Sequence, residues 1–319
     1  MGYKISEIEY HLPDTVISNE LLNAKYGIDV NFDKIGIRER RIAGEDQSTS
    51  DLACLSANKL FENHPVKKEE IDLLILCTQN PDYKLPTTAC IVQHKLGLKT
   101  SCMAFDVNLG CSGFVYCVTI AGSMINSGLA TKALVLTVDQ YSKIINYTDK
   151  NTASLFGDAS ASAIVEKCED GYGVIGTDFG TDGSGAENLI AFNSGVCKNP
   201  GKDNFLYMNG REIFKFSFQT VPVSVNNVLS KCQVTKEDIR YFIFHQANKF
   251  MLNEIKKKMS LSEEQFIVDM ENCGNTVSST IPIVLQNLRK AKRINRGDLL
   301  LLCGFGVGLS WGSVIYKEL

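Results

Sequence analysis

Residues 105–114 read Phe-Asp-Val-Asn-Leu-Gly-Cys-Ser-Gly-Phe, and this stretch decides the fold. An apolar strand pattern at 102–107 runs into a turn that holds Cys111, and an apolar helix pattern follows at 115–125. The sequence therefore predicts a thiol at a strand-to-helix elbow, on the first turn of a buried helix. Such a position favours the thiolate, because the unpaired N–H groups of a helix start attract negative charge. The alternative is a buried cysteine that serves only as a small apolar side chain.

Strand and helix patterns alternate around this elbow. Strands are predicted at 73–77, 133–138 and 157–165. Helices are predicted from a cap at Ser50-Asp51 and, with proline in the first turn, from Pro86. Continuous apolar strands that are each followed by a helix indicate a parallel sheet covered on both faces. The predicted fold class is therefore α/β.

The second half of the chain repeats this order. Strand patterns at 241–244 and 299–303 match those of the first half, and residues 266–269 lead to Asn275 as residues 105–106 lead to Cys111. An internal duplication is the plain interpretation. We expect an N-terminal half, 1–167, and a C-terminal half, 168–319, that face each other with active residues at matching strand ends.

Between these patterns, residues 211–231 have apolar side chains at helical spacing, and Pro222 interrupts the pattern. The sequence predicts a long helix with a kink at this proline. Its aromatic stripe is expected to be core, with only the first turn near a site.

Bulk composition excludes several classes of function. The 319 residues carry a formal net charge of −3, which gives no general attraction to nucleic acid. The N-terminus shows no signal-peptide pattern, and no apolar run reaches the roughly 18 residues of a membrane span. Most of the 11 cysteines lie in apolar runs, no CxxC pair occurs, and only four histidines are present. We therefore expect a cytoplasmic protein without a disulfide framework, a metal site, or nucleic-acid or membrane partners.

Three polar residues converge if the two halves pack about a pseudo-twofold axis. Cys111 follows the central strand of the first half, His245 follows a strand of the second, and Asn275 nearly matches Cys111 in position. A cysteine beside a histidine is typical of nucleophilic catalysis. Asparagine and histidine together can stabilise an enolate or oxyanion, and the backbone of the glycine-rich residues 304–308 could complete an oxyanion hole. That glycine run is equally consistent with a simple tight turn.

Several short motifs, spread over nearly the whole chain, occur in the same order as in one known protein family. They are Tyr10-His11-Leu12-Pro13, Gly36-Ile37-Arg38-Glu39-Arg40-Arg41, the Cys111 elbow, Phe156-Gly157-Asp158, Met208-Asn209-Gly210 with Phe214, His245-Gln246-Ala247-Asn248, Gly274-Asn275-Thr276 and Trp311-Gly312-Ser313. With these motifs the chain resembles the β-ketoacyl-acyl carrier protein synthase III family, condensing enzymes of the thiolase fold. The resemblance implies two duplicated halves in a five-layered αβαβα arrangement, and a homodimer.

The resemblance also implies a chemistry. Cys111, His245 and Asn275 would form a catalytic triad, and the backbone N–H groups of Cys111 and Val307 would form the oxyanion hole. Cys111 would take an acyl group from a thioester, either acyl-CoA or an acyl carrier protein. A malonyl-carrier thioester would then lose CO2 and attack the acyl group, in fatty acid or specialised lipid or polyketide synthesis. No permanently bound cofactor is implied.

Substrate-binding positions are also implied by the resemblance, and some depart from the family pattern. The implied positions are Asn248, which would hold the pantetheine arm, Gly210, Phe214, Arg38, Lys150, Leu85 and Tyr141. The tryptophan that stacks on the CoA adenine in this family is missing, and Val30, Asn31 and Phe32 lie there instead. Arg211, Lys150, Leu85 and Tyr141 also replace the expected residue types. A carrier-protein donor is therefore an alternative to acyl-CoA, and Lys249 and Lys256–Lys258 could dock an acidic carrier.

Two other functions remain open from the sequence. One is an acyltransferase that moves the Cys111 acyl group onto a hydroxyl or amine without decarboxylation, which the altered nucleotide-contact positions motivate. The other is a non-catalytic partner subunit that keeps the fold for interaction, against which the intact triad argues.

Overall fold

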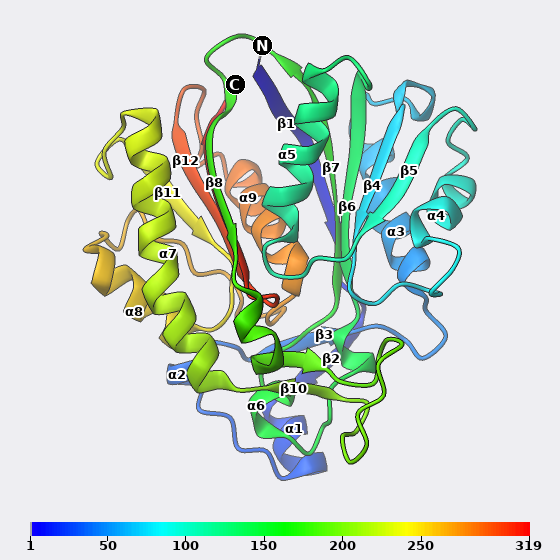
Figure 1. Ribbon diagram of the computed structural model, residues 1–319, viewed down its shortest axis with the longest axis vertical. Helices are drawn as coiled ribbons and strands as arrows, with labels where there is room; N and C mark the ends of the chain where they lie inside the picture. The colour runs from blue at the N-terminus through cyan, green and yellow to red at the C-terminus, as the bar shows by residue number, and fades with distance from the viewer. Residues whose placement is uncertain (1) are drawn as a thin grey trace.

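The computed structural model describes residues 2–319, which form two stacked sheets with helices between them and on both outer faces (Figure 1). The first sheet has the order β1-β7-β6-β4-β5. Its strands are β1 (Gly2–His11), β4 (Leu73–Cys77), β5 (Met103–Val107), β6 (Lys132–Asp139) and β7 (Ala159–Cys168). The three strands β5, β4 and β6 are parallel, as the sequence predicts, but β7 runs antiparallel to both β6 and β1. The sheet is therefore mixed rather than wholly parallel.

The second sheet has the order β11-β12-β13-β8. Its strands are β8 (Gly173–Thr181), β11 (Ile239–Phe244), β12 (Leu299–Gly306) and β13 (Ser310–Lys317). The segment 266–269, which was expected to match the strand before Cys111, forms only a single bridge from Phe266 to Phe242. The duplication is thus imperfect at the outer edge of the second sheet.

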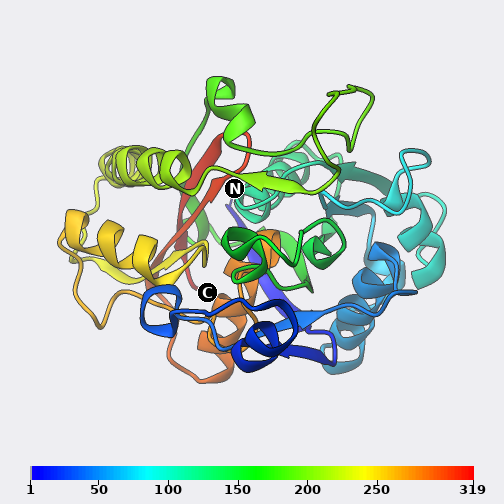
Figure 2. The ribbon, with the colours of Figure 1, turned by 90° about the horizontal axis from the view of Figure 1, so that it is seen from below.

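The helices build three layers around these sheets (Figures 1 and 2). They are α1 (Asn19–Tyr26), α2 (Phe32–Ile35), α3 (Thr49–Asn63), α4 (Thr88–Leu96), α5 (Gly113–Asn126), α6 (Lys150–Ala153), α7 (Gly210–Cys232), α8 (Lys249–Met259) and α9 (Thr280–Lys290). The inner layer is α5 and α9, whose apolar side chains share one core cluster with strands of both sheets. Helices α3 and α4 cover the outside of the first sheet, and α7 and α8 cover the second. The five-layered αβαβα arrangement is confirmed.

Local signals place most helix starts, with small corrections. Ser48 rather than Ser50 caps α3, because its side chain accepts from the N–H of Asp51 while the Asp51 carboxylate bonds back to it. Helix α4 starts at Thr88, so Pro86 lies before the helix and not in its first turn. Helix α7 is continuous through Pro222. Ile213, Phe216 and Val225 of its stripe are core, as expected, whereas Phe214 and Phe218 are only partly buried.

Two small antiparallel sheets of two strands each complete the structure. Strand β2 (Thr15–Ser18) pairs with β3 (Glu39–Ile42), and β9 (Leu189–Ala191) pairs with β10 (Leu206–Met208). Both lie beyond the ends of the sheets where β4, β5 and β6 finish, beside α6 and the first turn of α7 (Figure 1). Leu189 of β9 and Met208 of β10 contribute to the walls of the cavities described next.

Candidate active site

Cys111 lies between the end of β5 and the start of α5, one residue before the Ser112 N-cap, so it precedes the first turn of the helix. The chain at the end of β12 lies directly against it. A Cβ atom on Gly306 would fall 2.7 Å from the Cys111 Sγ, so a side chain has no space at position 306. The backbone N–H of Val307 donates to the same sulfur. The glycine-rich run is therefore more than a turn, because it places an N–H at the thiol.

His245 and Asn275 are held by the second sheet and its loops. His245 follows β11, and its Nδ1 lies 2.8 Å from the Thr280 Oγ1. Asn275 accepts at Oδ1 from the N–H of Val277 (2.9 Å). Its own backbone N–H donates to the carbonyl of Leu155 at 2.9 Å, so a loop of the first half fixes this residue of the second half. Both side chains are buried.

The three residues Cys111, His245 and Asn275 line one small cavity of about 70 Å³. The rest of its wall is mostly apolar and comes from both halves. It includes Leu155, Phe156, Leu189, Ile213, Met251 and Phe305. A thiol, an imidazole and an amide thus share a small and mostly apolar space, where hydrogen bonds to developing charge are stronger than in water.

A second, larger cleft of about 610 Å³ adjoins this cavity. The two share Leu155, Met208, Gly210, Asn248 and Met251 in their walls. The cleft adds three cations, Lys34, Lys150 and Arg211, and two aromatic rings, Phe214 and Phe250, whose centroids are 5.4 Å apart. Asn248 lies at the junction, and its side chain caps α8 by accepting from the N–H of Met251 at 2.9 Å.

Of the positions that the resemblance implied, Asn248, Gly210, Phe214 and Lys150 thus line the cleft, whereas three others lie apart from it. Arg38 is exposed, pairs with Glu271, and lies over the ring of Phe32 with 4.2 Å from its guanidinium carbon to the centroid. Leu85 is 82% exposed and lies outside both cavities.

Tyr141 is fully buried behind the inner wall. Its hydroxyl donates to the Gln79 Oε1 at 2.5 Å, and its ring centroid lies 4.9 Å from that of Phe156, which lines the cavity. Sequence reasoning missed Phe156 itself as a wall residue, although it lies in a quoted motif. It also missed Leu155, Met208 and Thr280, which carry no chemical signal in the sequence.

Burial dominates the electrostatics of the site. It raises the pKa of the Cys111 thiol to about 12, although the backbone N–H groups of Val307 and Cys111 lower it. The expectation that the helix start favours the thiolate is therefore wrong for the free enzyme. Burial also lowers the pKa of His245 to about 3, while the backbone at Val277 opposes this shift. At neutral pH the cavity holds a neutral thiol and a neutral imidazole.

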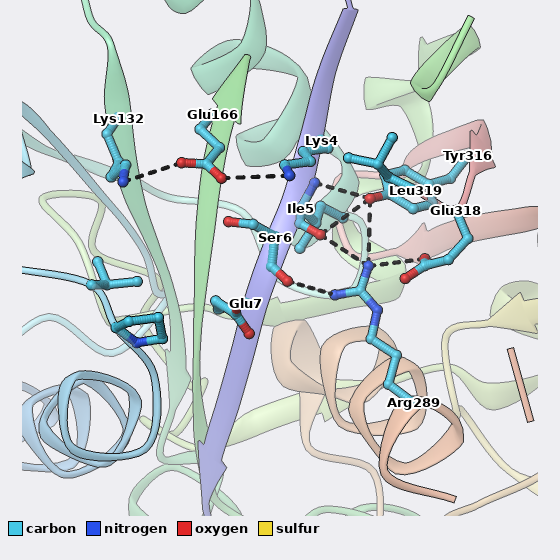
Figure 3. A pocket seen from close by; sticks show the side chains of 12 residues that line it. Lys4, Ile5, Ser6, Glu7, Lys132, Glu166, Arg289, Tyr316, Glu318 and Leu319 are labelled. Carbon is cyan, nitrogen blue, oxygen red and sulfur yellow. Dashed lines mark hydrogen bonds and ion pairs between the residues drawn. The ribbon is translucent and has the colours of Figure 1, made fainter. Parts of the chain in front are cut away.

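Within residues 2–319, no group of three or more His, Cys, Asp or Glu side chains is arranged to hold a metal ion. No helix in the same range combines the length and apolar character needed to cross a bilayer. A cavity of about 220 Å³ lies at the start of β1, where the charges of Lys4, Lys132, Glu166, Arg289 and Glu318 pair with one another (Figure 3). These ion pairs connect the start of β1 to the neighbouring β7, and α9 to the end of the chain.

Comparisons with known proteins agree with this geometry. The family model of 3-oxoacyl-[acyl-carrier-protein (ACP)] synthase III matches residues 105–183, and the model of its C-terminal part matches residues 229–317. A β-ketoacyl-[acyl-carrier-protein] synthase III of Caldanaerobacter subterraneus subsp. tengcongensis is 35% identical over 318 residues, which cover 96% of this chain and 95% of that protein.

Solved structures give the same result. A crystal structure of a 3-oxoacyl-(acyl-carrier-protein) synthase III matches with a TM-score of 0.95 and 41% identity, over 99% of this chain and 100% of that one. The β-ketoacyl-[acyl carrier protein] synthase III of Thermus thermophilus matches with a TM-score of 0.92 and 36% identity, over 98% of both chains. The chain therefore belongs to the β-ketoacyl-[acyl-carrier-protein] synthase III family and has the thiolase fold that its sequence predicts.

Proposed function

We propose that this acyltransferase loads an acyl group onto Cys111 and condenses it with a malonyl-carrier thioester in fatty acid or related lipid or polyketide synthesis. The observation that carries the proposal is the shared cavity of Cys111, His245 and Asn275, which adjoins a cleft of about 610 Å³ that we assign to the thioester arm. The cavity supplies a nucleophile, a proton carrier and an amide donor.

In the first half-reaction, the Cys111 Sγ attacks the carbonyl carbon of the donor thioester. The backbone N–H groups of Cys111 and Val307 stabilise the oxyanion that forms. Because the thiol is neutral in the free site, its proton must leave as the S–C bond forms, and the lone pair of the neutral His245 ring can accept it. The tetrahedral intermediate then expels the donor thiolate, which takes the proton from His245.

In the second half-reaction, the malonyl group loses its carboxylate as CO2. The electron pair left behind spreads onto the thioester oxygen, where the amide of Asn275 and the ring of His245 donate hydrogen bonds to the enolate. The enolate carbon attacks the acyl carbon on Cys111, and the S–C bond breaks. The ketoacyl product leaves, and the Cys111 thiolate takes a proton from water, which balances the negative charge of the carboxylate lost as CO2.

The cleft supports a long thioester arm as the common feature of both substrates. Asn248 and Gly210 lie where the cleft meets the cavity, and Phe214 with Phe250 offers an apolar wall. Lys34, Lys150 and Arg211 would attract the phosphates of CoA or the acidic surface of a carrier protein. Arg38 covers Phe32 at 4.2 Å, so that ring is a poor substitute for the missing adenine-stacking tryptophan, and this favours a carrier-protein donor.

We further propose a cytoplasmic homodimer that needs no permanently bound cofactor. The dimer is supported by β5, an edge strand of the first sheet, and by the neighbouring Leu85, which is 82% exposed and could reach a partner's acyl cavity. The proposed boundary of the two halves, 1–167 and 168–319, falls at the end of β7.

Intact-protein mass spectrometry with a panel of acyl-CoAs and acyl carrier proteins tests the first half-reaction. We expect an acyl mass gain that disappears in Cys111→Ala. It should persist in Cys117→Ala, a matched control, because Cys117 is buried in the adjoining helix α5 and lines neither cavity. No gain from any donor would refute acyl loading and support a non-catalytic role.

Release of CO2 from a malonyl thioester tests the second half-reaction. His245→Ala and Asn275→Ala should lose CO2 release, while Asn275→Ala still accepts an acyl group at Cys111. Retained CO2 release in both variants would contradict the proposed condensation. Ester or amide products from hydroxyl or amine acceptors, without CO2 release by the wild type, would instead support plain acyl transfer.

A further inference from the structure

One buried carboxylate joins the two halves directly behind the site. Asp139 is the last residue of β6 and is fully buried. Its Oδ1 accepts from the backbone N–H of Gln79 at 2.9 Å, just after β4 of the same sheet. Its Oδ2 accepts from the backbone N–H of Ser278 at 3.2 Å and also from the Ser278 hydroxyl, both in the second half. The sequence offered no signal for this role, because Asp139 lies at the start of what reads as a polar loop.

Through Ser278, Asp139 is connected to both His245 and Asn275. Ser278 is in the middle of a short 3₁₀ turn, Val277–Ser279. The turn begins where the N–H of Val277 donates to the Asn275 side chain at 2.9 Å. It ends at Thr280, whose hydroxyl lies 2.8 Å from the His245 Nδ1. A displacement of this turn therefore moves the Asn275 amide and the His245 ring together.

The Gln79 side of the bridge leads to the loop of the nucleophile. The Gln79 Oε1 lies 2.3 Å from the place where a Cβ of Gly110 would be, so this side chain packs directly on the residue before Cys111. The same oxygen accepts from the Tyr141 hydroxyl at 2.5 Å. Asp139 thus connects the nucleophile loop, through one hydrogen bond from Gln79, to the turn of its partners, through two hydrogen bonds from Ser278.

The charge of Asp139 also affects the neighbouring titratable groups. The ionised Asp139 raises the pKa of Cys111, of Tyr141 and of Cys77, which are the titratable groups that face it from the ends of β5, β6 and β4. Burial is the main cause that raises the pKa of Asp139 to about 7. The charge of Asp158, which lies just before β7, raises this pKa further. Three hydrogen-bond donors, rather than a paired cation, stabilise this carboxylate in the contacts described above.

We propose that Asp139 is a positioning residue of this site, whose carboxylate ties Gln79 to Ser278 and so sets the Asn275–His245 side of the cavity against Cys111. The inference rests on the proposed function of those three residues. It also assigns Asp139 an electrostatic effect on the Cys111 thiol, which can be measured without turnover.

Asp139→Asn is the decisive variant, because both oxygens of the carboxylate face backbone N–H donors. Whichever way the amide is turned, its NH2 group meets an N–H, and one side of the bridge must open. We expect kcat for condensation to fall about 100-fold, as for a displacement near 1 Å. KM should change less than about threefold, since Asn248 and the cleft are untouched.

The second measurement is the pH profile of Cys111 alkylation by iodoacetamide. It is read by peptide mapping, because Cys90 and Cys197 are exposed and also react. With the negative charge removed, the alkylation midpoint of Cys111 should move to lower pH in Asp139→Asn. An unchanged midpoint, or kcat within threefold of the wild type, overturns the proposal.

Ser279→Ala is the matched control. Ser279 is buried in the same turn, but its hydroxyl bonds to the carbonyl of Thr137 at 3.0 Å and not to Asp139. In Ser279→Ala, the alkylation midpoint of Cys111 should stay at the wild-type value. A shift as large as that in Asp139→Asn would contradict the role of the Asp139 charge.

Ser278→Ala keeps the proposal testable if Asp139→Asn does not fold. It removes one donor from the bridge, should lower kcat about tenfold, and overturns the proposal if kcat is unchanged. If the wild type accepts no acyl group, the proposed function fails, while the alkylation profiles still decide the role of Asp139.

Discussion

The Thr280 hydroxyl lies 2.8 Å from the His245 Nδ1 and donates to the carbonyl of Val277 at 3.1 Å. A hydroxyl has one hydrogen and two lone pairs, so it supports both neutral forms of the ring. With its hydrogen on the carbonyl, it accepts from Nδ1–H and leaves a lone pair on Nε2. With its hydrogen turned to Nδ1, the Nε2 atom carries the proton. His245 can thus accept a proton in acyl loading and donate a hydrogen bond to the enolate in condensation, and each resting form of the ring is neutral.

Thr280→Val removes this two-way partner at nearly constant volume. We expect both half-reactions to slow about tenfold, the equivalent of one hydrogen bond of about 1.4 kcal/mol. Thr280→Ser keeps the hydroxyl and should retain most of the wild-type rate. Nitrogen NMR of the ring can follow the tautomer directly, because the chain has only four histidines. Wild-type rates in Thr280→Val would contradict the argument.

Tyr141 limits the size of the acyl group in our interpretation. Its fully buried ring lies behind Phe156, with 4.9 Å between the two ring centroids, and so supports the wall of the 70 Å³ cavity. In Tyr141→Leu, the rate of Cys111 acylation by an eight-carbon donor, relative to a two-carbon donor, should rise at least about tenfold. Tyr141→Phe keeps the ring and should keep the wild-type preference. Mass spectrometry with donors of increasing chain length measures these acylation rates in the wild type and both variants. The same dependence on chain length in all three proteins would refute this role.

The sequence predicts those parts of the site that depend on local patterns of apolar, polar and glycine residues. The elbow of Cys111 follows from an apolar strand, two glycines and an apolar helix in one short stretch. His245 and Asn275 follow from the duplication, because matching positions of similar halves lie at matching strand ends. The layers follow as well, since strands that are apolar on both faces need helices on both sides.

The parts that the sequence could not predict depend on tertiary contacts. The helix-start argument for a Cys111 thiolate failed because burial, which no local pattern reports, outweighs the neighbouring N–H groups. Asp139 and Thr280 act through residues more than 30 positions away, so their roles are invisible without the fold. The direction of β7 was also missed, because a strand of small residues reads the same in either orientation.

Arg289 fastens the irregular start of β1, where the pairing with β7 is interrupted between Ile5 and Ile8 (Figure 3). Its Nη2 donates to the carbonyl of Ile5 and to Glu318, each at 2.9 Å. Arg289→Met leaves a largely buried carboxylate unpaired and should lower the free energy of unfolding by about 3–5 kcal/mol. Arg296→Met is the control, because its pair with Glu169 is exposed and should contribute at most about 1 kcal/mol.

Urea unfolding of both variants compares the two pairs. Specific activity of the folded Arg289→Met protein should remain near the wild type. The start of β1 lies at the end of the first sheet opposite to Asp139, because β1 and β6 both run antiparallel to β7. Equal stability losses in the two variants, or a selective loss of activity in Arg289→Met, would contradict this assignment.

His245 and Asp139 give the stability of the protein opposing pH dependences. Burial lowers the pKa of His245 from 6.5 to about 3, so its contribution is lost as pH falls from 6.5 towards 3. Burial raises the pKa of Asp139 from 3.8 to about 7, so its contribution is present below 3.8 and lost as pH rises towards 7. Each slope is at most about 1.4 kcal/mol per pH unit, and the two cancel between about pH 4 and 6.5.

Single variants should expose the two slopes separately. On acidification from pH 6.5 to 4.5, Asp139→Asn should lose stability relative to the wild type, because only the His245 contribution remains. His245→Gln should gain stability over the same range, because only the Asp139 contribution remains. Urea unfolding at several pH values measures the free energy of unfolding of each variant relative to the wild type. The contributions of the remaining carboxylates cancel in this comparison. Parallel curves for all three proteins would show that these two side chains do not carry the shifted pKa values assigned to them.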